Sequence, residues 1–132
     1  MDNDKFLKLY KKFPKLLPKN NIINCDAGLS NVIEDMLSAI KTYQDISAKT
    51  SNLIPVVFNF IKIKYGGLEI DYSGGDGVIQ HIVDFTKKLS FKTCESCGKI
   101  GKLYCSTKWM HWSNKKTLCN KHAVELFYYS IN

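Results

Sequence analysis

The chain has 132 residues, the length of one domain, and its formal net charge of +7 comes from 19 lysines with no arginine. Hydrophobic residues make up 45% of the sequence, which excludes a disordered tail. No apolar run approaches the roughly 18–20 residues that a membrane span needs. Without arginine, the commonest reader of guanine edges, the chain is poorly equipped for specific base recognition, although contact with an acidic surface stays open.

The N-terminus and the cysteine count both indicate a reducing compartment. The first 21 residues are lysine-rich and lack the apolar segment and the cleavage site of a secretory signal. Five cysteines, an odd number, are then expected to be thiols or metal ligands and not a disulfide framework. We therefore expect a cytoplasmic protein.

Residues 1–24 form a basic N-terminal arm, which Pro14 and Pro18 interrupt. One or two short amphipathic turns are expected to pack this arm on the domain through a few apolar residues, namely Phe6, Leu7, Tyr10 and Phe13. The alternative is a basic arm that binds nucleic acid.

Residues 28–46 are predicted to form the clearest helix, with Asp26 or Ser30 as its N-cap. Residues 55–73 alternate as two strands joined at Gly66 and Gly67, which supply the positive φ of a tight turn.

A second amphipathic helix is predicted over 77–89, with Asp76 as its N-cap and His81 at the surface. Its apolar side chains are expected at Val78, Ile82, Phe85 and Leu89. The glycine-rich loop before it lacks the lysine and hydroxyl ending of a phosphate-binding loop, so a plain connection is the better interpretation.

Two short pairs of potential ligands indicate a metal site. Cys94 and Cys97 have the spacing of a zinc knuckle, and Gly98 permits the tight turn. Cys119 and His122 follow after 21 residues and are expected in the first turn of a helix, where i and i+3 share one face. Knuckle, intervening hairpin and helix together predict a treble-clef-like finger that holds one structural Zn²⁺.

Catalysis is not expected. Four protein ligands, three of them thiolates, fill the shell that a catalytic zinc leaves open for water. His111, between Trp109 and Trp112, is the sole candidate general base, and Glu69 and Asp71 are expected to pair with neighbouring lysines. The two remaining cysteines, Cys25 and Cys105, are expected to be small buried hydrophobic residues.

A lysine- and tryptophan-rich segment in the finger is the candidate partner-binding surface. Its residues are Lys108, Trp109, His111, Trp112, Lys115 and Lys116. The indoles can instead cap the small core of the finger, or stack on bases.

The stretches "IKIKYGGLEIDYSGGDG", "CESCGKIGKL" and "TLCNKHA" resemble a family of small uncharacterised bacterial and phage proteins. In that family a "KEKFGGLRFY-SGG" hairpin precedes a "CxxCGxxGxL…W…TLCxxHA" tail. The resemblance spans about residues 12–123 and implies the same four ligands, but Leu29 stands where the family has tryptophan, and residues 104–116 form a longer stretch than the family pattern. It carries no activity over, and if the protein is phage-encoded, as such a resemblance suggests, the expected location is the host cytoplasm.

The sequence as a whole predicts an α+β fold in a single domain over 1–132, with an arm at 1–24, a helix–hairpin–helix core at 25–92 and a zinc finger at 93–132. We expect a non-enzymatic binding module that docks on a host protein and inhibits it, with no membrane partner and no small-molecule substrate. The alternative is a nucleic-acid-binding accessory protein, because residues 87–121 hold nine lysines against Glu95 alone.

Overall fold

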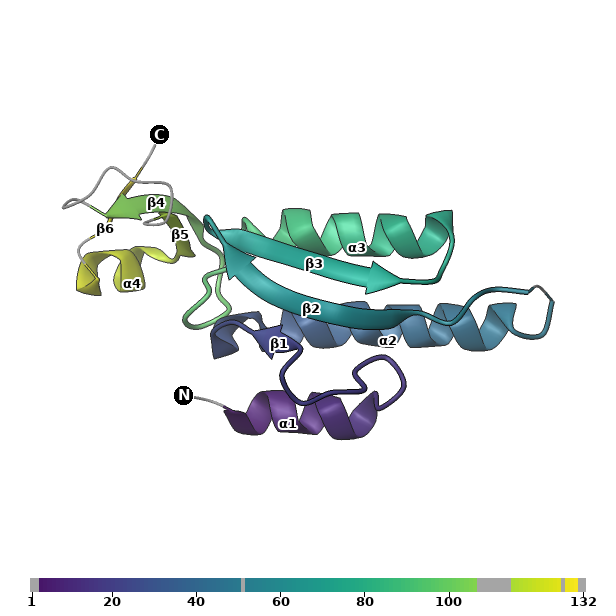
Figure 1. Cartoon of the computed structure of the whole chain (residues 1–132). Helices are drawn as coiled ribbons and strands as arrows, with labels where there is room; N and C mark the ends of the chain where they lie inside the picture. The colour runs from purple at the N-terminus through teal and green to yellow at the C-terminus, as the bar shows by residue number, and fades with distance from the viewer. Residues whose placement is uncertain (1–2, 51, 107–114, 127, 131–132) are drawn as a thin grey trace.

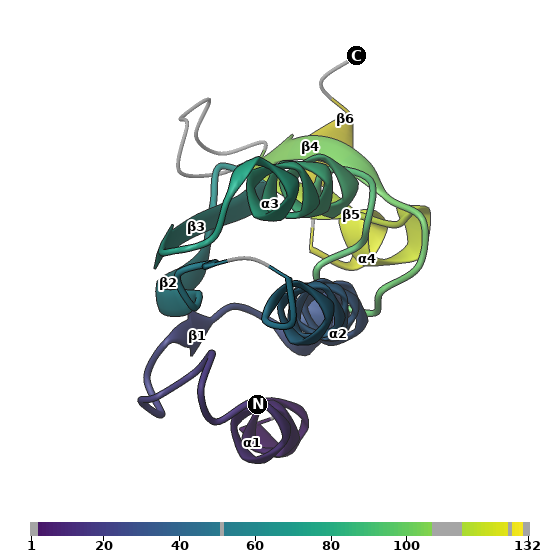
Figure 2. The same cartoon turned by 90° about the vertical axis from the view of Figure 1, so that its right-hand side faces the viewer.

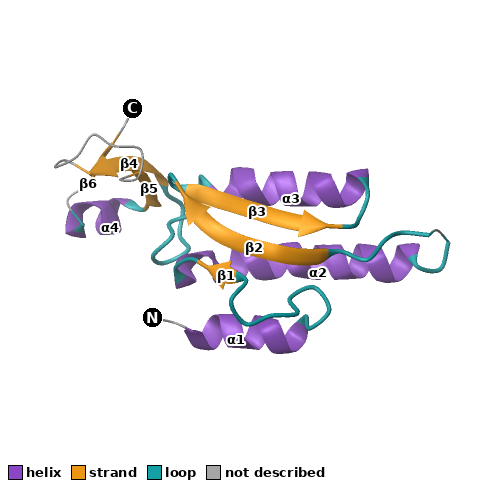
Figure 3. Cartoon of the chain, in the orientation of Figure 1, coloured by secondary structure: helices purple, strands orange, loops and turns teal. Residues whose placement is uncertain are grey.

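The computed structural model of the chain (Figure 1) describes residues 3–50, 52–106, 115–126 and 128–130. The helices are α1 (Asn3–Lys12), the 3₁₀ turn η1 (Ala27–Leu29), α2 (Ser30–Ser47), α3 (Gly77–Ser90) and α4 (Asn120–Glu125). The strands are β1 (Ile23–Asn24), β2 (Val57–Lys64), β3 (Gly67–Ser73), β4 (Lys102–Ser106), β5 (Lys115–Leu118) and β6 (Tyr128–Ser130). The predicted α+β class is confirmed (Figure 3).

A first sheet, ordered β1-β2-β3, carries α2 and α3 on one side (Figure 2). β1 runs parallel to β2, and β2 and β3 form the predicted antiparallel hairpin. The core lies between the sheet and the two helices, where buried apolar side chains exclude water. Its fully buried members include Ile33, Leu37, Ile40, Phe58, Ile61 and Ile79.

The N-terminal segment is part of this core. α1 extends over ten residues, longer than the one or two turns expected, and it buries Phe6 and Leu9, while Leu7 stays 46% exposed. Phe13, directly after the helix, is also buried. The chain after it follows the edge of β2, where the Leu16 carbonyl accepts a 3.0 Å hydrogen bond from the Phe58 amide.

The hairpin differs from its prediction at the turn and in its alternation. The turn is Tyr65–Gly66, with φ values of 53° and 86°, and Gly67 already belongs to β3. A Cβ on Gly67 would lie 2.2 Å from the Phe91 ring, so glycine is needed there for close packing. An irregularity between Phe58 and Phe60 shifts the register, so that Phe58 and Ile61 are both buried although simple alternation places them on opposite faces.

The two central helices begin differently. The side chain of Asp76 accepts hydrogen bonds from the amides of Val78 and Ile79, so the predicted N-cap of α3 is confirmed. α2 has no side-chain cap, because η1 leads directly into it and Asp26 makes no capping hydrogen bond. The N-cap predicted for this helix was therefore wrong.

α3 turns a different face to the core than its pattern predicted. Ile79, Val83 and Thr86 are buried, whereas the exposed fractions of Val78, Phe85 and Leu89 are 45%, 67% and 37%. The helix is apolar on two faces, and the sheet covers only one of them.

A second sheet, ordered β5-β4-β6, packs with α4 around its own small cluster of Cys94, Tyr104, Leu118 and Ala123. We call the described residues of this unit, 93–106, 115–126 and 128–130, the finger. It lies at the turn end of the first hairpin (Figure 1).

The finger contacts the core through close backbone approaches. The Gly28 amide donates a 3.0 Å hydrogen bond to the Glu95 carbonyl, and the Thr117 hydroxyl donates to the Gly66 carbonyl. We call these two contacts the joint. A Cβ on Gly28 would lie 2.4 Å from the Glu95 oxygen, and a Cβ on Gly66 would lie 2.2 Å from Leu103. Two glycines therefore let the two units meet.

Gly28→Ala is expected to lower the free energy of unfolding by about 1–3 kcal/mol, because its methyl group would overlap a backbone oxygen that cannot move without separating the joint. Gly77→Ala is the matched control, since no atom lies within 4 Å of a Cβ there. Thermal and denaturant unfolding of both variants measures the difference. Equal stability of the two variants would contradict the tight approach at Gly28.

Candidate metal centre

The first pair of donors sits in a tight turn that the backbone closes on itself. The Cys94 carbonyl accepts a 2.8 Å hydrogen bond from the Gly98 amide, and the Cys94 amide donates a 2.7 Å bond to the Lys99 carbonyl. Gly98 has a φ of 83°, the left-handed conformation that glycine adopts without strain. This turn brings Cys94 and Cys97 to the same side of the chain.

The second pair of donors stands at the start of α4, as predicted. Cys119 follows β5 directly and is the N-cap residue of the helix, and His122 lies in its first turn. The Cys119 carbonyl accepts a 2.9 Å hydrogen bond from the Ala123 amide, which fixes the first turn. The spacing of three residues therefore places both side chains on one face.

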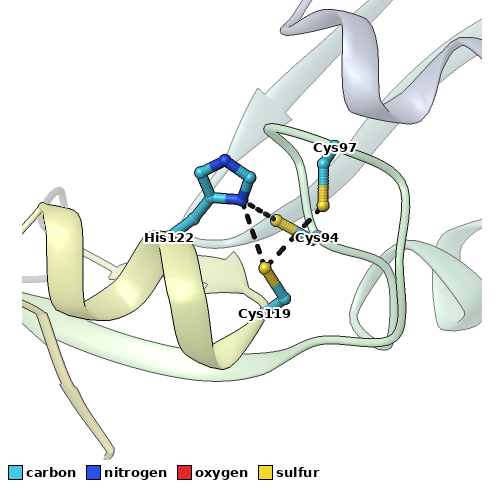
Figure 4. Close-up of side chains that lie close together, drawn as sticks. All are labelled: Cys94, Cys97, Cys119 and His122. Carbon is cyan, nitrogen blue, oxygen red and sulfur yellow. Dashed lines mark hydrogen bonds between the residues drawn. The ribbon is translucent and has the colours of Figure 1, made fainter.

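The four side chains converge (Figure 4), and their donor atoms all lie within 4.8 Å of one another. The Cys97 and Cys119 sulfurs are 3.7 Å apart, and the Nδ1 atom of His122 lies 3.6 Å from the Cys94 sulfur and 3.1 Å from the Cys119 sulfur. Zinc–sulfur bonds of about 2.3 Å in a tetrahedron give sulfur–sulfur edges of about 3.8 Å. This donor set can therefore hold one tetrahedral metal ion.

The thiols of the cluster interact strongly. The pKa of Cys119 is lowered to about 6, chiefly by a hydrogen bond from the His122 backbone amide, with further lowering by the side chains of His122, Cys97 and Cys94. The pKa of Cys97 is raised, because desolvation and the neighbouring thiols outweigh the hydrogen bond from the Lys99 amide. Cys119 therefore loses its proton readily, whereas a second negative charge on the neighbouring Cys97 is unfavourable. A divalent cation bound between the two sulfurs would stabilise both thiolates.

The orientation of His122 suits a metal ligand. Its Nδ1 atom faces the three sulfurs, and its Nε2 atom lies 4.0 Å from the Glu125 carboxylate, one turn along α4. Ligating histidines commonly have a carboxylate near the second ring nitrogen, and Glu125 occupies that place at a distance longer than a hydrogen bond.

Glu95, between the first two donors, is a buried carboxylate that the sequence patterns did not single out. Only 4% of its side chain is exposed, and its Oε1 atom lies 4.0 Å from the Lys116 ammonium. Its Oε2 atom has no hydrogen-bond partner among the described residues. Burial raises the pKa of this carboxyl to about 7, Lys116 opposes the rise, and Asp26 adds to it.

The one feature of the sequence that could have indicated Glu95 is its position. A residue between two ligands of a zinc knuckle has to lie close to the metal site. The same holds for Thr117, two residues before Cys119, which is fully buried and makes the contact with Gly66. Nothing in the sequence indicated the contact of Gly28 with Glu95, because a glycine before a helix is common.

The other candidates divide into described and undescribed residues. Lys108, Trp109, His111 and Trp112 lie outside the described part of the chain, so the proposed partner surface has structural data only at Lys115 and Lys116. Lys116 lies beside Glu95 and 5.8 Å from the centre of the Tyr128 ring.

The two cysteines outside the cluster are half-buried. Cys25 packs against the core, and burial raises its pKa to about 12, so it stays a neutral thiol. Cys105 lies in β4.

The two acids of β3 pair within the hairpin. Lys62 and Lys64 lie 3.3 Å and 3.6 Å from the Glu69 carboxylate, and the Asn59 amide donates a 2.8 Å hydrogen bond to Asp71. The expected lysine partners are therefore found for Glu69.

No family model, no curated protein and no solved structure matches this chain. Within the described residues, no helix has both the length and the apolar character to cross a membrane. The interpretation of the site therefore depends on its own geometry.

Cys97→Ser is expected to lower the metal content from one ion per chain to well below one, because serine is a poor ligand for a soft site. Cys105→Ser is the matched control, since Cys105 lies in the same unit outside the donor cluster and should keep the full metal content. Elemental analysis of protein purified without chelators measures both. Equal metal content in the two variants would contradict the assignment of the ligands.

Proposed function

We propose that the protein is a non-enzymatic binding module whose finger is held together by one structural Zn²⁺. The observation that carries this proposal is the convergence of three sulfurs and one imidazole nitrogen, from two segments, within 4.8 Å. Thiolate-rich tetrahedral sites favour zinc, and four protein ligands leave no position for a reacting water. Elemental analysis of the metal-loaded chain should identify zinc, and another metal in its place would contradict this step.

The absence of catalysis is also part of the proposal. The support is that the described acidic residues near the hairpin are engaged with neighbours: Glu69 with two lysines and Asp71 with an asparagine. Among the described residues, the group of metal-ligating side chains that converge is the cluster itself, whose four ligands would fill a tetrahedral shell.

The partner in this proposal is a protein, and the lysine- and tryptophan-rich segment is the docking surface. Tryptophan is the residue type most often found as an energetic anchor of interfaces. The resemblance to bacterial and phage proteins implies a host protein as the partner, whose activity the docking would inhibit.

A second candidate function, nucleic-acid binding, has one specific observation in its favour. Glu95, the only acid among residues 87–121, is buried, whereas Lys99, Lys102 and Lys121 of the finger are exposed. Among the described residues of the finger, these three exposed lysines outnumber the one exposed acid, Glu125. Phosphate contacts need no arginine, because they depend on charge and not on base recognition.

Salt dependence separates the two functions. If the finger binds duplex, affinity should fall with salt at a log–log slope of about −0.9 per phosphate contacted. Charge reversal by Lys99→Glu and Lys121→Glu should flatten that slope. Lys49→Glu is the control, because Lys49 lies beyond the end of α2 and outside the finger, and it should leave the slope unchanged. These lysines are better targets than Lys116, whose reversal would place a second carboxylate beside Glu95.

The protein-docking function makes the opposite prediction. Trp109→Ala or Trp112→Ala should abolish capture of the protein partner with little change in circular dichroism, and moderate salt should weaken capture only slightly. Tight, salt-sensitive duplex binding with no protein partner recovered would contradict the proposal in favour of the second candidate.

A further inference from the structure

A small polar pocket lies between α1 and the start of α2, which are neighbours in the fold (Figure 1). It has a volume of about 200 Å³, and its polar lining consists of Lys5, Lys8, Lys12, Ser30, Asn31 and Glu34. Three lysines against one carboxylate give this lining a net charge of +2. The pocket therefore attracts an anion.

The three lysines occupy one stripe of α1. Their spacing of three and four residues places them on the same face of the helix, where like charges repel one another. Lys12 donates a 2.9 Å hydrogen bond to the Glu34 carboxylate, so its charge is matched. Lys5 and Lys8 have no ion pair with any described residue. Two positive charges thus line the pocket without a counter-charge among the described residues.

Ser30 is the recessed part of this pocket. Only 7% of the residue is exposed, and its hydroxyl makes no hydrogen bond to any residue that the structure describes. Buried hydroxyl groups are normally paired, because an unpaired one has lost its hydrogen bonds to water on folding. The hydroxyl is not used as a helix cap either, since η1 leads directly into α2. It is therefore available to donate a hydrogen bond to an anion that the lysines attract.

We propose that this pocket binds the phosphate group of a phosphate monoester. Such a group carries a charge of about −1.5 to −2 at neutral pH and has three acceptor oxygens. Lys5 and Lys8 match that charge, and the Ser30 hydroxyl donates to one of the oxygens. The site involves neither the metal centre nor the finger, so it is independent of the function proposed above.

The charge of the pocket favours a monoester over a nucleic-acid backbone. Each backbone phosphate is a diester with a single negative charge, and successive phosphates form a row that an open basic surface would contact. Here the unmatched charges and the recessed hydroxyl meet in one place, which suits one doubly charged group.

Titration of the full, metal-loaded chain with inorganic phosphate tests the site. At fixed pH and at an ionic strength held constant with chloride, the Kd is expected to be on the order of 1 mM, because exposed charge pairs are weak. Binding should shift the amide NMR signals of Ser30 and Asn31, while those of Phe58 and Ile61 in β2 stay in place. Unchanged Ser30 and Asn31 signals at about 20 mM phosphate, which would saturate such a site, would overturn the proposal.

Substitutions in the pocket locate the site. Lys5→Gln and Lys8→Gln should each weaken phosphate binding about threefold, because each removes one exposed charge. Lys11→Gln is the matched control, since Lys11 is an exposed lysine of the same helix that does not line the pocket, and it should bind phosphate normally. Equal weakening by Lys11→Gln would indicate a diffuse effect of net charge and overturn the proposal.

Ser30→Ala tests the recessed hydroxyl. It should weaken phosphate binding roughly tenfold, because a hydrogen bond to a charged group is lost. Without phosphate it should leave the melting temperature unchanged or raise it, since the hydroxyl is unpaired and alanine favours the helix. Phosphate binding by Ser30→Ala as tight as that of the wild type would contradict the role of Ser30.

Methyl phosphate and dimethyl phosphate distinguish the two kinds of ester. Methyl phosphate, a monoester, should bind as inorganic phosphate does and shift the same two amides. Dimethyl phosphate, a diester with a single charge, should bind more weakly by about threefold or more. Equal binding of the two esters would overturn the assignment of a monoester.

Discussion

The convergence of Cys94, Cys97, Cys119 and His122 is the constraint on which the C-terminal third of the chain depends. Among the described residues of the finger, the buried cluster consists of Cys94, Tyr104, Leu118 and Ala123. Each such residue stabilises a fold by roughly 1.5–3 kcal/mol, which does not offset the entropy of ordering a unit of this length. A structural zinc is associated with about 10–16 kcal/mol in finger peptides, so the metal would supply the larger part of the stability here.

The same cluster would also position the finger against the core. The joint consists of the hydrogen bond from the Gly28 amide to the Glu95 carbonyl and of that from the Thr117 hydroxyl to the Gly66 carbonyl. Glu95 and Thr117 each lie within two residues of a donor. A metal that fixes the donors therefore fixes both sides of the joint, while the sheet with α2 and α3 has its own core and does not need the metal.

The sequence predicted those parts of the molecule that local spacing controls. The four donors lie in two pairs whose separation of two residues determines their geometry, and the cap at Asp76 depends on the next three residues only. The hairpin follows from alternation and from glycine in its turn, although the turn lies one residue earlier than expected, and Gly67 instead makes room for the Phe91 ring.

Long-range packing decided what the sequence could not predict. α3 has apolar side chains on two faces, and no local rule says which face the sheet will cover. The irregularity in β2 places Phe58 and Ile61 on one side, and only the register with β3 reveals it. The joint depends on Gly28 and Glu95, 67 positions apart in the chain, a contact that neither local pattern contains.

Amide hydrogen exchange of the chain, loaded with zinc and then stripped by a chelator, tests most directly whether the metal holds the finger and its joint. The account predicts that stripping sharply accelerates exchange at the amides of Gly28 and Glu95, which donate to the carbonyls of Glu95 and Thr117. Exchange at the amides of Phe58 and Ile61, which donate to Leu16 and Ile22, should stay slow. Unchanged protection at Gly28 and Glu95 in the stripped protein, or loss of protection at all four amides together, would contradict the account.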